Sequence, residues 1–412
     1  METGGRRPDG PNGWDPMSQF PMDGPAARNP YPKLAELRRT TPVGRRQAWS
    51  DAGEAVEAVE VYRYDDVAAV MRDNDSFSSS SVRAGMEPVM GKYVLVGMDE
   101  PEHRRLRDLV ATGFRPKSIA HWETDIVLPV VDEMIDAFAA RGEAELVQEL
   151  TFRYPVQVIA AILGLPLEDH AKFHAWASSI INLVAAPVEG MTAAAELRDY
   201  LAVVLDDRRA HPSGDFVSEL AAVELDGERL GDEEIFSFLR LLLPAGAETT
   251  YRATGNLLFG LLSNPAQLDA VCADRSLVVQ AVEESIRWET PLMITSRVAT
   301  CDVEFAGTPV AAGTQVIPNV GAANHDETRW DHAEDYDLFR EQKPMISFGV
   351  GPHMCLGMHL ARMEMRTALS RLLHRCPGLR FDDDAVARDD VHIHGETFRS
   401  PTTLPVLFDA AA

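Results

Sequence analysis

A single cysteine, Cys355, stands in a stretch of sequence that could hold a metal through its sulfur. The stretch covers residues 347–362 and reads SFGVGPHMCLGMHLAR. Gly349 and Gly351 allow backbone turns that are closed to other residues, and apolar residues recur after the cysteine at helical spacing. The free N–H groups at the start of a helix favour a thiolate, so we expect them to lower the pKa of Cys355.

The neighbours of Cys355 suit a flat, apolar ligand. Phe348 offers a wall that keeps water from the sulfur, and Gly357 lets a flat ligand lie against the backbone. A thiolate in such a setting is what a thiolate-ligated haem requires, because the sulfur pushes electron density toward the iron. The alternative is a buried free cysteine in a glycine-rich turn, which is the common fate of a lone cysteine.

Glu248 and Thr249 form a second group that could do chemistry. They lie in the longest predicted helix, 230–262, within the segment LLLPAGAETTYR. Pro244 and Gly246 would break most helices, so we expect this helix to bulge there and open backbone groups to a ligand or water. An acid beside a hydroxyl at such an opening can relay protons. The alternative for Thr249 is a hydrogen bond back to its own helix.

Charged residues at helical spacing could bind an anion or brace the fold. His103 and Arg107 lie four residues apart in the predicted helix 98–116, where Asp99 is the expected N-cap, so they share one face. Two cationic donors on one face suit a carboxylate ligand. In the predicted helix 278–290, Glu284 and Arg287 are spaced for an intrahelical ion pair, although most such pairs are merely solvated.

Elements that position these residues are mostly helical. Besides the helices already named, we expect helices at the start of 31–43, at 64–71, through most of 122–225, and at 363–376. Strand signals gather at 55–64, 291–298, 303–317 and in a last hairpin from 394. The region 77–96 is rich in Ser, Gly and Pro, and we expect an irregular loop there.

Composition limits the function classes. The chain has 412 residues, 45% of them hydrophobic, and a formal net charge of −25, which argues against nucleic acid or an anionic membrane surface as a partner. Its four cysteines lack paired spacing, so they point to a reducing compartment rather than a zinc site. Residues 1–29 lack the apolar run of a signal peptide and are expected to be a disordered leader. We therefore expect a soluble, cytoplasmic protein, with no membrane span.

The motifs, taken together and in order, resemble those of the cytochromes P450. The family pattern Phe-Gly-x-Gly-x-His-x-Cys-x-Gly is filled by Phe348, Gly349, Gly351, His353, Cys355 and Gly357. The pattern Ala-Gly-x-(Asp/Glu)-Thr of the oxygen-binding helix is filled by Ala245, Gly246, Glu248 and Thr249. The resemblance covers about residues 30–408. It implies a mainly α fold with a small β-rich lobe, built as a single domain over residues 30–412.

The resemblance also implies residue roles around haem b. Cys355 would be the axial ligand of the iron, and Ala245, Phe348, Gly349 and Gly357 would lie against the haem. The propionates would be neutralised by His103, Arg107, Arg297 and His353, although Arg297 could instead be a solvated arginine at a strand edge. Glu248 and Thr249 would deliver protons to dioxygen. A buried triad of Glu284, Arg287 and Arg340 would brace the cysteine loop without reacting.

The implied activity is a monooxygenase reaction that inserts one oxygen atom from O2 into a C–H bond. The chain has no flavin fingerprint, so electrons would come from a ferredoxin served by an NAD(P)H reductase, docked near a basic patch of Arg104, Arg105, Arg107 and Arg362. We expect a monomer. A peroxide-dependent peroxygenase and a non-catalytic haem-binding or substrate-binding protein remain alternatives, and a cysteine-dependent hydrolase lacks its orienting histidine.

Apolar side chains are expected to line the substrate pocket, which favours a terpenoid, steroid, fatty acid or aromatic compound. They are Val89, Met90, Val94, Ile180, Leu243, Ala245, Met293, Ile294 and Phe398.

Overall fold

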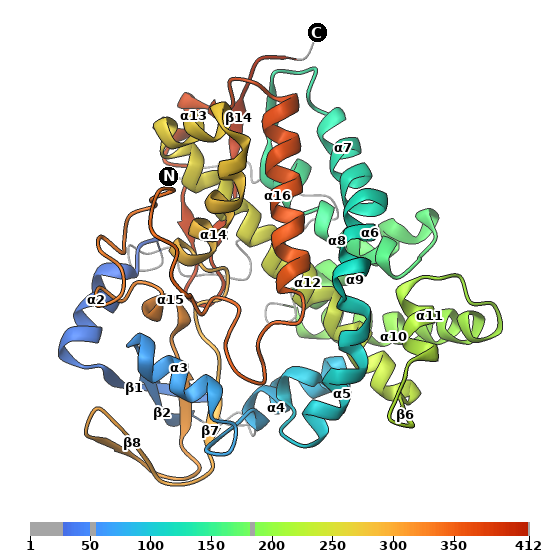
Figure 1. The fold of residues 1–412 in the computed structure, drawn as a ribbon, viewed down its shortest axis with the longest axis vertical. Helices are drawn as coiled ribbons and strands as arrows, with labels where there is room; N and C mark the ends of the chain where they lie inside the picture. The colour runs from blue at the N-terminus through green and yellow to red at the C-terminus, as the bar shows by residue number, and fades with distance from the viewer. Residues whose placement is uncertain (1–27, 50–54, 182–185, 411–412) are drawn as a thin grey trace, which may run out of the picture.

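The computed structural model describes residues 28–49, 55–181 and 186–410. Figure 1 shows a large helical part and, at one corner, a smaller lobe that contains β1, β2, β7 and β8. This arrangement confirms the expected fold class of a mainly α protein with a small β-rich lobe. Most of the expected leader, 1–27, lies outside the described residues. Among the described helices, none combines the length and apolar character that a membrane crossing requires.

Helices occur in both the N-terminal lobe and the helical part, and several are flanked by short 3-10 or π helices. They are α2 Tyr31–Thr40, α3 Tyr64–Arg72, α4 Ser80–Met90, α5 Glu102–Ala111, α6 Pro116–Trp122, α7 Leu128–Asp136, α8 Tyr154–Ile162, α9 His170–Ile181, α10 Pro187–Ala210, α11 Phe216–Ala222, α12 Asp232–Leu262, α13 Pro265–Ala273, α14 Val278–Trp288, α15 Val320–Ala323, α16 Met358–Arg375 and α17 Asp383–Ala387.

The strands form one larger sheet and several small ones. The five-stranded sheet has the order β1-β2-β10-β7-β3, with β1 Val43–Trp49, β2 Ala55–Val61, β3 Phe77–Ser78, β7 Arg297–Ala299 and β10 Gln315–Pro318. A three-stranded sheet joins β11 Arg380–Phe381, β14 Pro405–Leu407 and β4 Glu143–Glu145. Three further pairs are β5 Glu224–Leu225 with β6 Glu228–Arg229, β8 Val303–Phe305 with β9 Thr308–Val310, and β12 Ile393–His394 with β13 Ser400–Pro401.

Helix α12 is the central element of the helical part. Its first turn is acidic, and Glu234 accepts a hydrogen bond of 2.8 Å from the backbone N–H of Gly231, which satisfies a donor at the helix start. Most of its side chains are buried on all sides, and it packs against α8, α14, α16 and β13. The prediction that the longest helix spans about 230–262 is confirmed.

Helix α4 corrects the expectation of an irregular loop at 77–96. The residues form β3 and then an α-helix that carries Pro88 in its last part. Arg240 of α12 donates from Nη1 to the carbonyl oxygen of Val89 at 3.1 Å and so satisfies a free carbonyl at the helix end. Contacts from a distant helix therefore override a local composition that is typical of a loop.

Asp99 has a different role from the N-cap that the sequence predicted. Helix α5 begins at Glu102, and its N-cap position is Pro101, which has no capping side chain. The carboxylate of Asp99 instead accepts hydrogen bonds from the backbone N–H of Ser79 at 2.8 Å and from the hydroxyl of Ser78 at 2.5 Å. Asp99 thus ties the start of α4 to the segment before α5.

Candidate active site

The loop that carries Cys355 has the tight turns that its glycines predict. Gly349 and Gly351 have φ angles of 71° and 79°, in the left-handed region that favours glycine. The backbone N–H of Cys355 donates to the carbonyl of Phe348 at 2.8 Å. Helix α16 then begins at Met358, three residues after the cysteine, so the sulfur lies just before a helix N-terminus.

Two glycines of this loop also meet spatial demands. A Cβ on Gly351 would lie 2.7 Å from the carbonyl oxygen of Met71, so the loop packs closely against the end of α3. A Cβ on Gly357 would meet no described atom within 4 Å. The loop is therefore closely packed on one side and open beside Gly357, where a flat ligand could lie against the backbone.

Cys355 is accessible to solvent although protein surrounds it. Desolvation by that protein raises the pKa of the thiol. A hydrogen bond from the backbone of Gly357 and the charges of Arg107 and Arg362 lower the pKa, but desolvation outweighs them. The expected net lowering of the pKa of Cys355 is wrong for the protein alone.

Four donors expected to bind an anion are brought together from three parts of the chain. The rings of His103 on α5 and His353 on the cysteine loop lie 4.0 Å apart between centroids. Arg297 from β7 and Arg107 from α5 both act on His353, and desolvation together with these charges lowers the pKa of His353 to about 3. Both histidines are therefore neutral here, since burial also lowers the pKa of His103. Only the two arginines carry positive charge.

Two buried nitrogens in this cluster lack partners within the part of the chain that the structure describes. The Nε–H of Arg297, which is 3% exposed, is a donor, whereas Nε2 of the neutral His103, which is 1% exposed, is an acceptor because Nδ1 of that ring donates to Glu100. A buried donor without an acceptor costs about 1–3 kcal/mol, so an acceptor at this place would be stabilised. Arg297 is also not the solvated arginine of the alternative interpretation. An accessible thiol, two arginines and the unpartnered donor of Arg297 fit a haem with its carboxylates.

Helix α12 keeps its regular hydrogen bonding where the expected proton-relay residues lie. It remains an α-helix through Pro244 and Gly246. The hydroxyl of Thr249 donates to the carbonyl oxygen of Ala245 at 2.8 Å, which is the back-bond to its own helix. The predicted bulge is therefore absent from this described helix, while Ala245 is exposed as a haem contact would be.

Glu248 has a partner that the sequence analysis did not identify. Its carboxylate accepts a hydrogen bond of 3.1 Å from Nη2 of Arg252, one helical turn further on. Nη1 of Arg252 donates to the hydroxyl of Ser400 on β13 at 3.0 Å. The i,i+4 spacing of Glu248 and Arg252 could have predicted the pair. No local pattern could have predicted Ser400.

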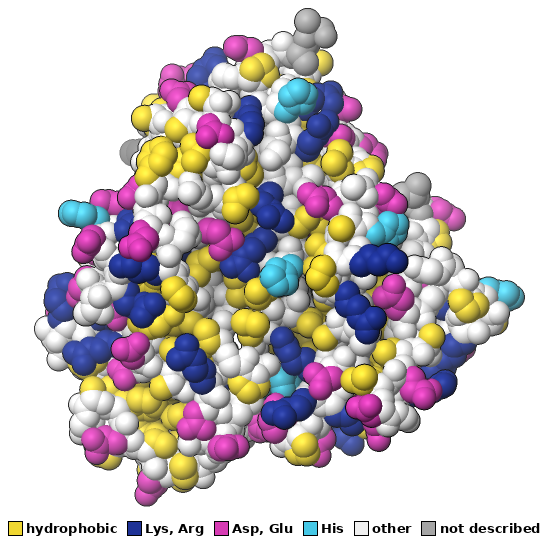
Figure 2. Space-filling view, in the orientation of Figure 1, with side chains coloured by type: hydrophobic (Ala, Val, Ile, Leu, Met, Phe, Trp, Pro, Cys, Tyr) yellow, Lys and Arg dark blue, Asp and Glu magenta, His cyan; other side chains and the backbone are white. Residues whose placement is uncertain are grey.

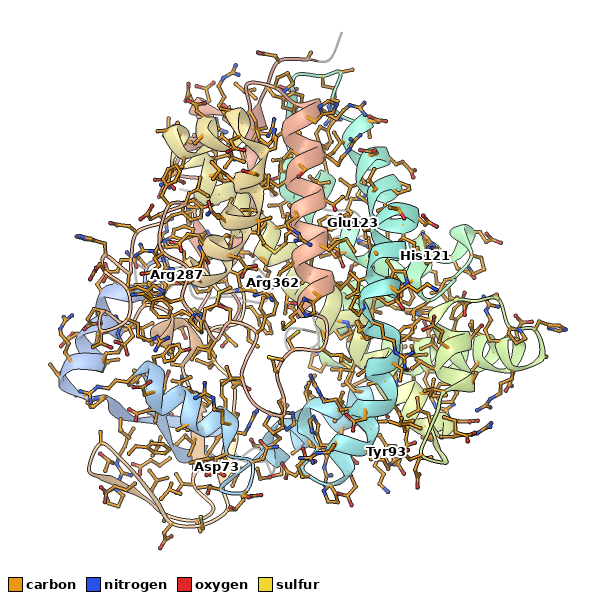
Figure 3. All side chains as sticks on the ribbon, viewed as in Figure 1. Asp73, Tyr93, His121, Glu123, Arg287 and Arg362 are labelled. Atoms are coloured by element: carbon orange, nitrogen blue, oxygen red, sulfur yellow. The ribbon has the colours of Figure 1, made fainter. Side chains whose placement is uncertain are left out.

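The expected triad is assembled. Arg287 donates to both carboxylate oxygens of Glu284, at 2.9 and 2.7 Å, and Arg340 donates to one of them at 3.1 Å. Arg287, labelled in Figure 3, also donates to the carbonyl oxygens of Asn324 and Ala333. The triad thus joins α14 to the segment that leads to the cysteine loop.

The expected pocket residues fall into two groups. Val89, Met90, Val94, Ile180 and Leu243 belong to the main hydrophobic core around α12.

Met293 is separate from that core. It packs with Tyr31, Leu34 and Tyr62 of the N-terminal lobe, and Ile294 borders the same cluster, so the structure does not bring these two together with the first group. Phe398 pairs through its backbone with Leu292, which the sequence analysis did not select, and its ring lies beneath Arg252. The segment 180–188, where the resemblance implies a lid over the substrate channel, lies partly outside the described residues.

The expected basic patch is largely neutralised. Figure 2 shows Lys and Arg side chains over the middle of the face that bears α5 and α16, mixed with Asp and Glu. Arg105 pairs with Glu234, and Arg362 forms two bonds to Glu283, at 2.6 and 2.9 Å. Arg104 has its Nε 3.5 Å from a carboxylate oxygen of Glu100.

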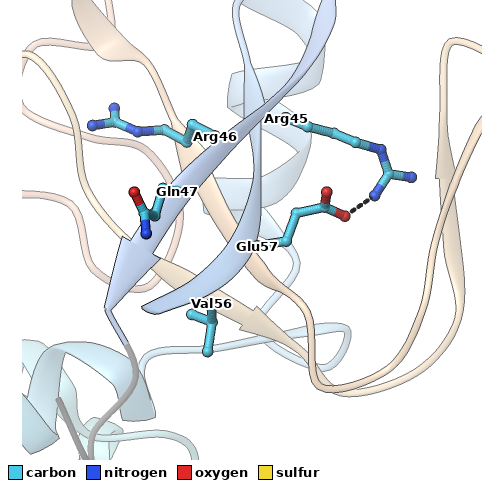
Figure 4. A pocket seen from close by; sticks show the side chains of 5 residues that line it. All are labelled: Arg45, Arg46, Gln47, Val56 and Glu57. Atoms are coloured by element: carbon cyan, nitrogen blue, oxygen red, sulfur yellow. Dashed lines mark hydrogen bonds and ion pairs between the residues drawn. The ribbon is translucent and has the colours of Figure 1, made fainter. Parts of the chain in front are cut away.

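A hollow elsewhere on the surface carries no comparable chemistry. Figure 4 shows its lining on the β1–β2 hairpin, with an ion pair between Arg45 and Glu57. It includes none of the residues around Cys355, and most of the side chains that line it are charged or polar.

Comparison with solved structures supports the fold. The chain superposes on cytochrome P450 CYP109Q5 from Chondromyces apiculatus with a TM-score of 0.86 and 34% identity, covering 94% of this chain and 97% of that one. The structure of CYP109E1 from Bacillus megaterium in complex with testosterone gives a TM-score of 0.82 at 29% identity, covering 92% of this chain and 99% of that one.

Sequence comparison gives the same result. The family model described as cytochrome P450 matches residues 189–379. The chain is 34% identical to the cytochrome P450 monooxygenase PikC of Streptomyces venezuelae, covering 86% of each. It is 33% identical to the vitamin D(3) 25-hydroxylase of Pseudonocardia autotrophica, covering 92% of this chain and 94% of that relative. The chain therefore belongs to the cytochrome P450 family, whose members are oxidoreductases that use haem b as their cofactor.

Proposed function

We propose that this protein is a monooxygenase that inserts one oxygen atom from O2 into a C–H bond of a hydrophobic small molecule. The observation that carries the proposal is the arrangement around Cys355: an accessible thiol near Arg107, on a loop whose His353 lies near Arg297 and the unpartnered donor of that arginine. When bound there, haem supplies the redox chemistry that activates dioxygen. The protein binds, orients and delivers protons.

Each residue of the site has a proposed part. Cys355 would hold the iron through its sulfur as a thiolate, so the thiol, whose pKa is raised in the protein alone, would have to lose its proton. Arg107 and Arg297 bind the propionates as charged donors, and the neutral rings of His103 and His353 lie beside them. Residues 30–412 form the single domain that holds the site.

Proton delivery is proposed for Glu248 and Thr249. Burial raises the pKa of Glu248, and Arg252 opposes that rise, so the carboxylate can accept a proton from water and pass it on. The hydroxyl of Thr249 must leave its bond to the carbonyl of Ala245 before it can donate elsewhere. We therefore expect the relay to form only when a ligand or water competes for that carbonyl.

The substrate is proposed to be a rigid hydrophobic compound of the steroid or terpenoid kind. Support comes from the apolar side chains near α12 and from the testosterone complex and the vitamin D(3) 25-hydroxylase among the similar proteins. Electrons are proposed to come from a ferredoxin with its NAD(P)H reductase, in the cytoplasm, with the protein as a monomer.

A second candidate is a peroxide-dependent peroxygenase. It is favoured by one observation: Thr249 is bonded to Ala245 and Glu248 to Arg252, so the relay is not assembled in this conformation. Such an enzyme would need no two-proton delivery by the protein.

Isotope labelling separates the two candidates. The holoprotein is incubated with testosterone and NADH, a surrogate ferredoxin and its reductase, under 18O2, and the product mass is measured. We expect one 18O atom per product. Product that forms only with hydrogen peroxide, without label from 18O2, would establish the peroxygenase. If testosterone does not shift the haem absorbance, a panel of terpenoids, steroids, fatty acids and aromatic compounds is screened for that shift first.

A further inference from the structure

Arg252 joins the proposed proton relay to the last hairpin of the chain. Its guanidinium donates to Glu248 through Nη2 and to Ser400 of β13 through Nη1, at 3.1 and 3.0 Å. All three side chains are buried, with exposed fractions of 8% for Glu248, 1% for Arg252 and 3% for Ser400. A rigid planar fork in such a place fixes both partners at once, which a lysine could not do.

The same guanidinium also contacts a residue expected in the pocket. Its central carbon lies 5.4 Å from the ring centroid of Phe398, two residues before Ser400, and 4.8 Å from that of Tyr251. A ligand that moved the ring of Phe398 would therefore press on the group that holds Glu248. The terminal hairpin and α12 are 148 residues apart at this contact, so Arg252 connects distant parts of the chain.

The charge of Arg252 affects whether Glu248 is protonated. Burial raises the pKa of Glu248, and the charge and hydrogen bond of Arg252 lower it. The titratable neighbour Tyr251 interacts electrostatically with both groups, and burial raises its pKa, so it stays neutral. Removal of Arg252 would leave a buried carboxylate without its cation, and such a group takes up a proton instead of remaining charged.

We propose that Arg252 is a positioning residue that keeps Glu248 ionised and oriented, and that Ser400 and Phe398 make this hold responsive to a ligand in the pocket. The inference rests on the proposed role of Glu248 in proton delivery. A bound ligand that shifts the terminal hairpin would weaken the hydrogen bonds of Arg252. The carboxylate of Glu248 would then accept hydrogen bonds from water differently. Proton delivery would then be coupled to occupation of the pocket.

Infrared spectroscopy of the holoprotein tests the ionisation directly. A protonated carboxyl has a C=O stretch distinct from that of a carboxylate. We expect R252Q to show a new protonated-carboxyl band at neutral pH, and the double variant R252Q/E248Q to lack it. R240Q is the matched control, because it removes another buried guanidinium from α12 without touching Glu248. Equal spectra for R252Q and the native protein would overturn the proposal.

Two further variants separate charge from the link to the hairpin. R252K retains a cation near Glu248 but cannot bond both partners, so it should show little of the band. S400A removes the hydrogen bond to the hairpin but keeps the contact with Phe398, and it should shift the Glu248 carboxylate band on its own. An unchanged spectrum in S400A would refute the coupling through Ser400.

Rates of oxygen consumption distinguish a wrong role for Arg252 from a wrong role for Glu248 in proton delivery. With NADH and the surrogate ferredoxin system, R252Q should slow oxygen consumption by roughly tenfold or more, because positioned acid–base groups contribute about 10²–10⁴-fold. The pH dependence of that rate should change in R252Q and return toward the native profile in R252K. If E248Q slows the rate and R252Q does not, the relay stands and the role of Arg252 fails. If neither slows it, the relay itself fails.

Discussion

Arg340 and Glu284 form an ion pair of 3.1 Å across 56 residues of sequence, and the same carboxylate holds Arg287. The side chain of Glu284 is 1% exposed, and both arginines also donate to backbone carbonyls of the segment before the cysteine loop. This segment has little regular structure of its own. The ion-paired group therefore replaces secondary structure as the support of the loop.

Loss of the ion-paired group should lower the stability of the protein and also speed the release of haem. E284Q leaves two buried arginines without their carboxylate, and breaking such a buried pair costs about 3–5 kcal/mol. We expect a lower midpoint of urea unfolding and faster haem transfer to apomyoglobin. E304Q, at an exposed position on β8, is the control. Normal stability in E284Q would show that the triad does not brace the loop.

Replacement of a propionate donor should weaken haem binding without unfolding the protein. R297Q removes a buried guanidinium whose Nε lacks a partner among the described residues, so the protein without haem should lose little stability. Charge-assisted bonds to a carboxylate contribute about 1.5–3 kcal/mol each, which corresponds to at least a tenfold faster loss of haem. R45Q, in the hairpin of Figure 4, provides the comparison. Equal rates of haem loss in R297Q and the native protein would show that Arg297 does not bind a propionate.

His174 should make the protein sensitive to acid. Burial and the charge of Arg153 lower its pKa to about 4, against an ordinary value near 6.5. The unfolded chain therefore binds one more proton than the folded chain between these values, and stability falls as the pH falls through that window. We expect H174F, which retains the contact with Phe152, to recover up to about 3 kcal/mol at pH 4 relative to pH 7.

The measurement for His174 is the free energy of unfolding at a series of pH values. H121N, at an exposed position on α6, should follow the native curve. Parallel curves for H174F and the native protein would show that His174 is not neutral when the protein is folded.

The hydroxyl of Thr249 should control how much reduced oxygen is lost as peroxide. T249V keeps the shape of the side chain but cannot donate a proton, so we expect more hydrogen peroxide per NADH consumed and less product. The neighbouring T250V is the matched control, because Thr250 is buried in α12 and has no proposed part in the relay. A similar peroxide yield in both variants would contradict the assignment of Thr249.

Local patterns were sufficient for the cysteine loop. Gly349 and Gly351 adopt positive φ because the turns require it, and this demand is visible in the sequence itself. Acid-rich residues at the start of α12 likewise predicted where that helix begins.

Features that depend on distant contacts could not be predicted in this way. Helix α4 forms where Ser, Gly and Pro predict a loop, because Arg240 binds its last turn. The helix opening expected at Pro244 is also not found, because α12 on both sides of that turn is buried against distant elements. The contact of Arg252 with Ser400 has no local signature at all. In each case the deciding partner lies far away in sequence.

The central claim is that the sulfur of Cys355 holds the haem iron. The purified holoprotein is reduced under carbon monoxide and its absorbance recorded, with C355S and the exposed-cysteine variant C272S beside it. We predict a band at about 450 nm, which thiolate ligation produces, in the native protein and in C272S, and its loss in C355S. A native protein without that band, or a C355S variant that retains it, would contradict the account.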